Sequence, residues 1–528
     1  MQAHSIHPFF NTLYQRISAY AGEQSLWQNK AQDLKTRFEQ DNADLDTALT
    51  LAHEAQRVIK VHAAGLETSK AFVKDLANTQ APIWPDFQEP PAEEEMQDGL
   101  VDMLYYDSPD PDTDRPIFAL GDQARYVGRR LVEKALDDGL DFQVNFVDPN
   151  FGALLMNHAD ANGIDGLARD KLAQWANVTK VIHCDACTPR ETLLTPDSGK
   201  MQELRNKTGA IDERKMRGEI GFRLTVIPTE ADAELDGFDD TDYTRLFFEL
   251  CDQPWPWIEQ AHHNLIPKLD AAQTLHIAND DGTDITLDLI DDDGEPFTFC
   301  DSRTQRNIPG SEVFSAPRRN GVNGTIVANG QFSPGEGKII KNLTLHFDNG
   351  YLYDFTADEG AEHFQEFLDR NPLHRYVGEL GIGTNPHLKR HVLNGLLVEK
   401  ISGSFHVALG KCYAMTEYDG APVHVDNGNS DPENPPEHWD ITTMLFGKSG
   451  KMTINKGCAD EQVIMENGLF SDRELDVLNR GWAAVPVDAR PDYWKNYQGP
   501  EYGLGAPRDM LAQNGHSTKN RQLHNKPE

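Results

Sequence analysis

The spacing of apolar residues changes along the chain and predicts regions of different architecture. From about residue 8 to 78, apolar side chains recur at helical spacing with little Gly or Pro between them, which predicts a helical hairpin or small bundle. The apolar positions of this pattern are Leu26, Leu34, Phe38, Leu45, Leu49, Leu51 and Ile59. The stretch 79–111 is rich in Pro and acidic residues, which is typical of a linker or a wrapping arm. Residues 1–112 are therefore expected to form a helical extension followed by a linker.

The rest of the chain is expected to fold as an α/β protein. Over 113–300, helix and strand patterns alternate, with a helix near residues 124–135 and strands at 142–147 and 223–227. This alternation predicts an α/β domain with a largely parallel sheet. Residues 301–488 are richer in strand patterns and predict a second, strand-rich α+β domain. Residues 489–528 are rich in Gly, Pro, Asn and Lys and predict a polar tail that is extended or poorly ordered.

Composition and charge narrow the classes of function. With 528 residues, 38% of them hydrophobic, the chain is long enough for two or three domains. No apolar run approaches the roughly 20 residues of a membrane span. The net charge of -36 would repel phosphate, which argues against a nucleic-acid or membrane partner. Residues 1–8 lack the basic start and apolar stretch of a signal peptide, and the six cysteines are dispersed. The expected compartment is the cytoplasm.

Two short segments carry residues that suit metal-assisted hydrolysis. Residues 406–413 begin with His406 and end with Tyr413, and a His-x-Asp pair follows at His438 and Asp440. On an extended segment the two side chains of such a pair point to the same face, so they can hold one divalent ion. Upstream, Glu312 lies between two prolines in a stiffened stretch. A second carboxylate, Glu379, lies in a run of glycines and apolar residues, which suits a bridging ligand or a general base.

The order of these motifs resembles a known family of metallopeptidases. The chain has Pro-x-x-Glu-Val-Phe-x-Ala-Pro at 309–317, Gly-Glu at 378–379, His-x-Ala-Leu-Gly at 406–410 and His-x-Asp at 438–440. In this order they resemble the M29 family, the thermophilic aminopeptidases T and S, with weaker similarity from about residue 113 to 488. One departure is Val398, which stands where the family usually has Asp before the Glu399-Lys400 pair and leaves the role of Glu399 open.

The resemblance implies both an activity and a set of site residues. The implied protein is a metallo-aminopeptidase with two divalent ions per chain (Zn, Co or Mn), peptide substrates with a free N-terminus, and a homodimeric assembly. The family's metal ligands fall on Glu312, Glu379, His406, His438 and Asp440, and its catalytic tyrosine falls on Tyr413. Glu379 is the expected general base or bridging ligand, and Tyr413 is expected to donate a hydrogen bond to the developing oxyanion.

Several alternatives remain open from the sequence. His424 and Asp426 have the same His-x-Asp spacing, but a turn-forming loop follows them, so the later pair is favoured. A trio such as Glu312, His438 and Asp440 could instead hold one Fe²⁺ in a ring-cleaving dioxygenase of related fold. A non-catalytic scaffold that keeps the fold is the third possibility. The Cys-x-x-Cys at 184–187 has no second pair at zinc-ribbon spacing, and the acidic run at 291–294 is interpreted as a hairpin turn.

Overall fold

The computed structural model describes residues 94–500, with short gaps. The gaps are Asp107, Asp122, Gln123, Asp148, residues 187–193, Thr195 and residues 335–337. The expected helical region at 8–78 and the tail beyond residue 500 lie outside the described residues, as does Cys187 of the Cys-x-x-Cys pair. Among the described helices, none combines the length and the apolar character that crossing a membrane requires.

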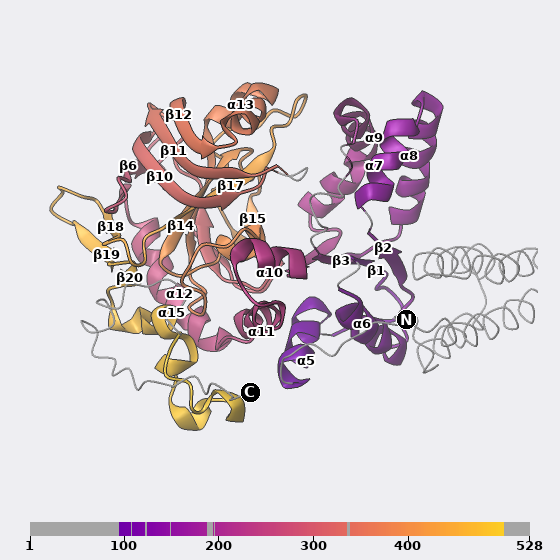
Figure 1. Cartoon of the computed structure of the whole chain (residues 1–528), viewed down its shortest axis with the longest axis horizontal. Helices are drawn as coiled ribbons and strands as arrows, with labels where there is room; N and C mark the ends of the chain where they lie inside the picture. The colour runs from indigo at the N-terminus through magenta and orange to yellow at the C-terminus, as the bar shows by residue number, and fades with distance from the viewer. Residues whose placement is uncertain are drawn as a thin grey trace, which may run out of the picture.

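The first part of the described chain is built on a parallel five-stranded sheet. Its strands follow the order β2 (Gln143–Phe146), β1 (Pro116–Leu120), β3 (Lys180–Ala186), β4 (Gly221–Ile227) and β8 (Asn307–Ile308). Every neighbouring pair is parallel, as the alternating pattern predicts. The helices of this part are α5 (Glu94–Leu104), α6 (Arg125–Asp137), α7 (Pro149–His158), α8 (Ala161–Trp175), α9 (Ser198–Met216), α10 (Glu230–Asp236) and α11 (Asp240–Cys251). Figure 1 shows α7 to α9 on one side of the sheet and α5 and α6 on the other.

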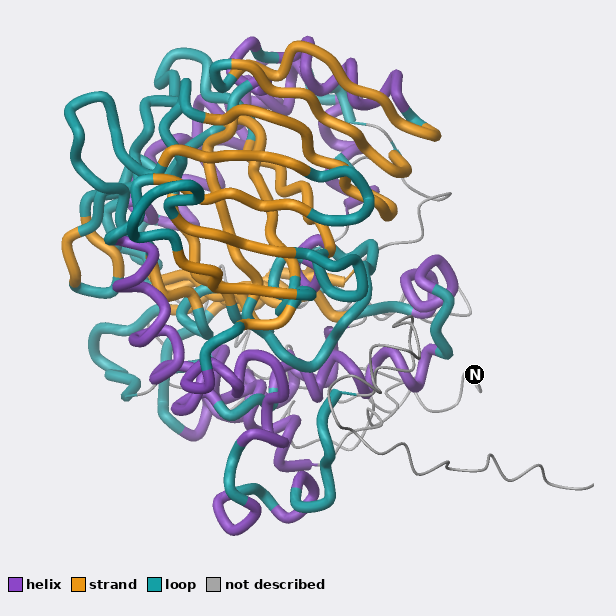
Figure 2. The backbone as a smooth tube through the Cα atoms, turned by 90° about the vertical axis from the view of Figure 1, so that its left-hand side faces the viewer, coloured by secondary structure: helices purple, strands orange, loops and turns teal. Residues whose placement is uncertain are grey.

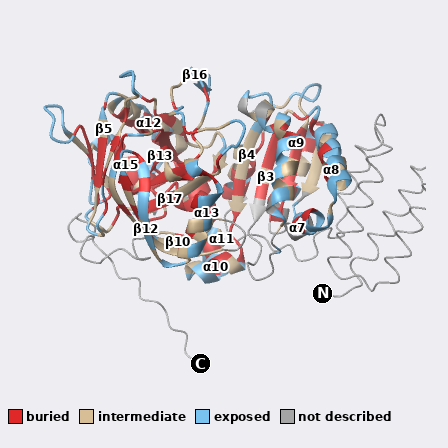
Figure 3. Cartoon of the chain, turned by 90° about the horizontal axis from the view of Figure 1, so that it is seen from above, coloured by how far each residue is buried: buried red, intermediate tan, exposed pale blue. Residues whose placement is uncertain are grey.

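Alternation along the strands explains why helices cover both faces. Phe118 of β1 and Ile182 of β3 pack in one cluster with residues of α5, α6 and α11. Their chain neighbours Ile117 and Val181 point the other way and pack against Trp175 of α8. Side chains on a strand alternate between faces, so continuous apolar runs require a cover on each side. Figure 3 shows β3 and β4 beside α7 to α9, whose outer surfaces are exposed.

Two segments are more ordered than their composition predicts. Residues 94–104, expected to be part of a linker, form α5, in which Met96, Leu100 and Leu104 recur every four residues and are buried. The described start of the polar tail also packs, because Trp494 is buried in the same cluster as α5 and α6. The α5 segment therefore belongs structurally with the parallel sheet, on the other side of the expected boundary at 112.

The second part consists of two antiparallel sheets. The eight-stranded sheet has the order β12 (Tyr351–Glu359), β11 (Ile340–Asp348), β10 (Val322–Phe332), β6 (Asp284–Asp288), β5 (Thr274–Ala278), β18 (Lys451–Ile454), β19 (Gln462–Glu466) and β20 (Leu469–Phe470). The five-stranded sheet has the order β17 (His438–Met444), β14 (Ser404–Gly410), β13 (Val377–Gly383), β9 (Glu312–Ser315) and β7 (Cys300–Ser302). The expected boundary at 300/301 falls inside β7, and the antiparallel strands begin earlier, at β5.

Shorter elements surround these sheets. They are α12 (Trp255–Asp270), α13 (Ala361–Arg370), η4 (Pro372–Arg375), α14 (Gly395–Val398), the hairpin β15 (Glu417–Tyr418) and β16 (Ala421–Pro422), η5 (Arg473–Leu475), α15 (Asp476–Arg480), η6 (Gly481–Ala484), η7 (Val487–Ala489) and η8 (Asp492–Trp494). The long connection between β13 and β14 contains α14 and packs into the core of the first part through Leu388, Val392 and Leu397. This connection therefore joins the two parts of the molecule.

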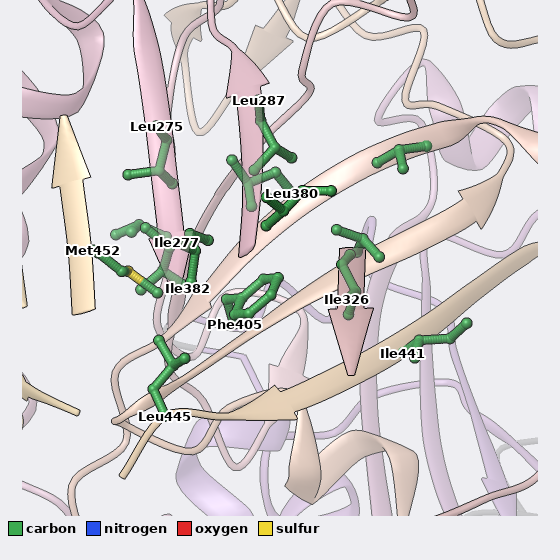
Figure 4. Close-up of a cluster of buried hydrophobic side chains, with 14 of the residues drawn as sticks. Leu275, Ile277, Leu287, Ile326, Leu380, Ile382, Phe405, Ile441, Leu445 and Met452 are labelled. Carbon is green, nitrogen blue, oxygen red and sulfur yellow. The ribbon is translucent and has the colours of Figure 1, made fainter. Parts of the chain in front are cut away.

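The main hydrophobic core lies between the two antiparallel sheets. Figure 2 shows the stacked strands of this region, and Figure 4 shows the side chains that fill the space. The eight-stranded sheet contributes residues such as Ile277, Leu287 and Ile326, and the five-stranded sheet contributes Leu380 and Phe405. Because one face of the five-stranded sheet is occupied by this core, alternate residues of its strands are left to form something else on the opposite face.

Candidate metal centre

The strand register places five predicted site residues on the same face of the five-stranded sheet. Glu379 of β13 lies opposite Ala408 of β14, and Ala408 lies opposite Asp440 of β17. His406 lies two residues before Ala408, and His438 lies two residues before Asp440, so all share a face. Glu312 of β9 lies opposite Gly383, which is four residues beyond Glu379 and on its side of the sheet. This is the face that points away from the main core.

The five side chains form two overlapping groups. Ligand atoms of Glu312, Glu379 and His406 lie within 4.8 Å of one another, and so do those of Glu379, His438 and Asp440. The Nε2 atom of His406 lies 3.5 Å from Glu312 Oε2 and 3.4 Å from Glu379 Oε1. Glu379 is common to both groups, and its other oxygen, Oε2, lies 3.1 Å from His438 Nε2. The two oxygens of Glu379 therefore face the two imidazoles.

The hydrogen bonds of His438 fix which of its nitrogen atoms faces the carboxylates. Its Nδ1 donates to the backbone carbonyl of Lys411 at 2.7 Å, so in the neutral ring Nε2 carries a lone pair. This lone pair points toward Glu379 and toward Asp440, whose Oδ1 is 3.5 Å away. Among the described residues, Glu312 Oε2 and Asp440 Oδ1 are buried with no hydrogen-bond partner. Converging acceptors of this kind require a cation between them, so the donor set fits a divalent ion.

The pKa values reflect the same concentration of negative charge. Burial alone would lower the pKa of His406, but the hydrogen bond to Glu379 and the charges of Asp440 and Glu312 raise it to about 9. Burial also disfavours a charge on His438, yet Asp440 and Glu379 raise its pKa well above the ordinary value. Burial would raise the pKa of Glu379, but the two histidines lower it. When no metal is bound, both imidazoles are therefore protonated, and their positive charges balance part of the negative charge of the carboxylates.

Comparison with known proteins identifies the family of this chain. The model of the thermophilic metalloprotease (M29) family matches residues 119–470. The chain belongs to the M29 family. This membership implies a divalent metal cofactor, for which the carboxylate and histidine cluster is the candidate site.

Individual relatives match over shorter stretches. Aminopeptidase AmpS of Bacillus subtilis is 30% identical over 178 residues, which cover 30% of this chain and 41% of AmpS. Aminopeptidase 2 of Geobacillus stearothermophilus is 32% identical over 157 residues, or 28% of this chain and 35% of that protein. The chain thus spans less than half the length of these curated relatives. The solved structure of wild-type AmpT from Thermus thermophilus has a TM-score of 0.55 and 18% identity, covering 72% of this chain and all of AmpT. This likeness shows a shared fold.

Tyr413 lies beside the group formed by Glu379, His438 and Asp440. Its ring centroid is 5.1 Å from that of His438 and 5.6 Å from that of Phe314. Burial, followed by the charges of Glu379 and Asp440, raises the pKa of the Tyr413 hydroxyl well above its ordinary value. The hydroxyl therefore stays protonated and can donate a hydrogen bond.

Gly381 creates the space that the imidazole of His406 occupies. The two residues are paired across β13 and β14, and a Cβ atom at Gly381 would lie 2.1 Å from His406 Nε2. No real side chain tolerates that approach. A glycine at this position of β13 thus accommodates the imidazole of His406.

The buried ion pair of Lys400 was not predicted from the sequence. Lys400 Nζ lies 2.5 Å from Glu312 Oε1 and 2.8 Å from Glu399 Oε1, and the lysine is 2% exposed. Burial raises the pKa of Glu399 to about 8, against the opposing charge of Lys400. The only hint of this ion pair in the sequence was that Glu399 and Lys400 belong to a motif of the family. Val398, the departure from that motif, packs in the core that joins the two parts of the molecule.

The other sequence candidates lie outside this cluster. His424 stacks on Phe297 and its Nε2 lies 3.2 Å from Asp291, while Asp426 accepts hydrogen bonds from Cys412 and Gly428. This His-x-Asp pair therefore has its own partners, away from Glu379. The acidic run at 291–294 forms a turn, in which the Asp291 carboxylate accepts the backbone N–H groups of Asp293 and Glu295.

Proposed function

We propose that the protein is a metal-dependent aminopeptidase that hydrolyses the first residue from peptides at a centre of two divalent ions. The observation that carries the proposal is the position of Glu379, whose carboxylate belongs to both groups of possible ligands. A carboxylate shared between two sites is the usual bridge of a two-metal hydrolase. The relatives named aminopeptidases support the same activity.

The donor set suggests which residues would hold each ion. Glu312, Glu379 and His406 would hold one, and Glu379, His438 and Asp440 would hold the other. Imidazole and carboxylate donors suit Zn²⁺, Co²⁺ or Mn²⁺. When bound, such ions polarise a scissile carbonyl and lower the pKa of the attacking water.

The remaining chemistry is assigned to two side chains. Glu379, buried and facing both histidines, would accept the proton of the attacking water or bridge the two ions. Tyr413, whose hydroxyl stays protonated, would donate a hydrogen bond to the oxyanion of the tetrahedral intermediate. The bond is strongest when the negative charge is present, so it lowers the barrier rather than only improving substrate binding.

The relatives named aminopeptidases make a peptide with a free amino group the proposed substrate. An acetylated N-terminus lacks that amino group, so an acetylated peptide should not be cleaved. A homodimer belongs to the same proposal, as does a division into an α/β domain built on the parallel sheet and a catalytic domain built on the two antiparallel sheets.

The direct test uses chelator-treated protein. Co²⁺ or Zn²⁺ is titrated back while release of leucine from a leucyl peptide is compared with an N-acetylated control. We expect release that needs the free amine and saturates near two metal equivalents per chain. Saturation at one equivalent would overturn the two-ion centre. No release with any divalent ion would overturn the peptidase assignment and turn attention to oxygen-dependent ring cleavage with Fe²⁺.

The chain supplies a matched control for the second ligand group. His438→Gln should reduce bound metal from two equivalents to one, because His438 is the imidazole of that group. His424→Gln alters the other His-x-Asp pair, and metal content should stay at two. Equal metal content in both variants would contradict the assignment of His438.

A further inference from the structure

A second network of polar side chains, centred on the buried His262, contacts the start of β9 and the end of β13. His262 of α12 is fully buried, and its Nδ1 lies 2.7 Å from Asp301 Oδ1. Its Nε2 lies 2.9 Å from Thr384 Oγ1 and 3.2 Å from Ser311 Oγ. Arg303 in turn binds both carboxylate oxygens of Asp301, at 3.0 and 2.8 Å. The sequence contains no motif that links these residues.

The order Asp301, His262, Ser311 resembles that of a hydrolytic triad, but the site cannot act as one. Ser311 and Thr384 have 0% exposure, as has His262, so a substrate cannot reach either hydroxyl. A nucleophile must approach the carbonyl it attacks. The network therefore has a role inside the protein.

The positions of the two hydroxyls in the chain indicate what that role is. Ser311 directly precedes Glu312 at the start of β9, and Thr384 directly follows the last residue of β13. The backbone N–H of Thr384 donates to the carbonyl of Ser311 at 2.9 Å, and Glu312 lies opposite Gly383. His262 thus contacts the two strand ends at the point where they place Glu312 beside Glu379.

We infer that His262 is a positioning residue which, through Ser311 and Thr384, holds the end of β9 against β13 and so sets the place of Glu312. The inference rests on the proposed metal centre for its functional consequence. Asp301, held by Arg303, orients the imidazole, as carboxylates orient metal-binding histidines elsewhere. We call the contacts of His262 with Asp301, Ser311 and Thr384 the anchor. It continues through Arg303 to the surface, where Arg303 forms an ion pair with Glu259 at 2.8 Å.

Variants of His262 separate this role from simple core packing. In His262→Asn the amide can still reach Asp301 but not the strand ends, whereas in His262→Gln the amide can reach Thr384 and Ser311. Thr384→Val and Ser311→Ala remove the hydroxyls with little change in shape. His276→Asn is the matched control, because His276 also pairs with a carboxylate, Asp284 at 2.8 Å, but on the eight-stranded sheet.

Two readouts test the inference. Titration of metal-free protein with Co²⁺, followed by visible absorption, should show one of two binding steps weakened by roughly tenfold in His262→Asn and Thr384→Val, within the range for groups that orient ligands. His262→Gln should recover part of the loss, and His276→Asn should match the wild type. Hydrogen exchange of the peptide containing 311–315, measured without metal, should quicken in the same two variants.

The outcomes distinguish this inference from the proposed function. If the wild type does not bind two ions, the two-ion centre is wrong, and hydrogen exchange alone decides whether the anchor exists. If the wild type binds two ions and the His262 and Thr384 variants bind them equally well, His262 does not position Glu312. Equal losses in His262→Asn and His262→Gln would assign His262 to core packing instead. Should His262→Asn fail to fold, Thr384→Val and Ser311→Ala carry the same test.

Discussion

The candidate metal centre has two halves that differ in their access to solvent. The inner half consists of Glu312, His406 and Lys400, whose side chains are 6%, 1% and 2% exposed. The outer half consists of His438 and Asp440, with side chains 22% and 24% exposed, and Tyr413 beside them. Both halves lie on the same face of the same sheet, and Glu379 connects them.

The difference follows from the elements that cover each half. The connection between β13 and β14, which carries Lys400 and packs into the joining core, covers the inner half. His438 and Asp440 of the outer half lie on β17, which is one of the two edge strands of the sheet. Electrostatic interactions strengthen where water is excluded, so we expect an inner ion to be held more tightly and an outer ion to exchange and meet the substrate. Four substitutions test this division.

The largest effect is expected from the residue that both halves share. Glu379→Gln keeps the shape but removes the charge that faces both imidazoles, so both ions should bind more weakly. We expect kcat to fall by about 10³-fold or more, in the upper range for loss of a general base. Steady-state kinetics and metal analysis on the same sample provide the measurement.

Glu437→Gln is the control for this change. Glu437 directly precedes His438, but its carboxylate forms an exposed ion pair with Arg370 at 2.7 Å. Exposed pairs of this kind contribute little, so activity and metal content should stay at the wild-type level. A Glu379→Gln variant that keeps full kcat with two bound ions would show that the shared carboxylate has no role in the mechanism. Glu379 would then no longer connect the inner and outer halves of the site.

The next effect concerns the inner half alone. Lys400→Met leaves the carboxylates of Glu312 and Glu399 buried without their cation. Breaking a buried pair in this way costs about 3–5 kcal/mol of unfolding free energy. Chemical denaturation of the metal-free protein measures this loss of unfolding free energy. The loss should be smaller at pH 5 than at pH 8, because protons neutralise the buried carboxylates more readily at the lower pH. A loss below about 1 kcal/mol would show that Lys400 is not needed to balance the inner half.

Parts of the parallel sheet and one of its covering helices were predictable from the sequence. The patterns at 142–147 and 223–227 correspond to β2 and β4, because β-branched and aromatic residues favour strands, and the expected helix near 124–135 corresponds to α6. α5 was missed because flanking prolines and acids outweighed three apolar residues at a spacing of four. Such short signals are decided by what the helix packs against, which the sequence alone does not show.

The candidate site shows the same limit. Its five acidic and histidine residues could be proposed from the sequence because they stand in motifs that follow the order of a known family and are residue types that hold metals. The roles of Lys400 and His262 could not be predicted, because they depend on contacts between residues 88 and 122 positions apart in the chain. Gly381 is an intermediate case. Its glycine run is visible in the sequence, but only the strand register shows that Gly381 lies opposite His406 and leaves room for its imidazole.

A third substitution sharpens the role of the outer half. Tyr413→Phe removes only the hydroxyl, so metal content and KM should change little. We expect kcat to fall by about 10²-fold, as for loss of one hydrogen-bond donor to an oxyanion. Tyr418→Phe is the control, because Tyr418 also packs on Phe314, with ring centroids 5.4 Å apart, yet has no proposed contact with substrate. A drop in KM or metal content without a change in kcat would contradict the catalytic role.

The smallest effect is expected from Lys389, the other buried lysine of the connection between β13 and β14. It provides a comparison with Lys400. Lys389 Nζ donates to the Ser402 carbonyl at 3.0 Å, and burial lowers its pKa to about 7 from an ordinary value of 10.5. Between these two values the unfolded chain binds a proton that the folded protein does not, so Lys389 makes stability rise with pH. Relative to Lys389→Met, wild-type stability should rise by about 1 kcal/mol per pH unit between pH 7.5 and 9.5. Parallel stability curves for the two proteins across this range would mean that Lys389 is charged in the folded state. Lys389 would then carry a charge like Lys400, although it is buried without a carboxylate partner.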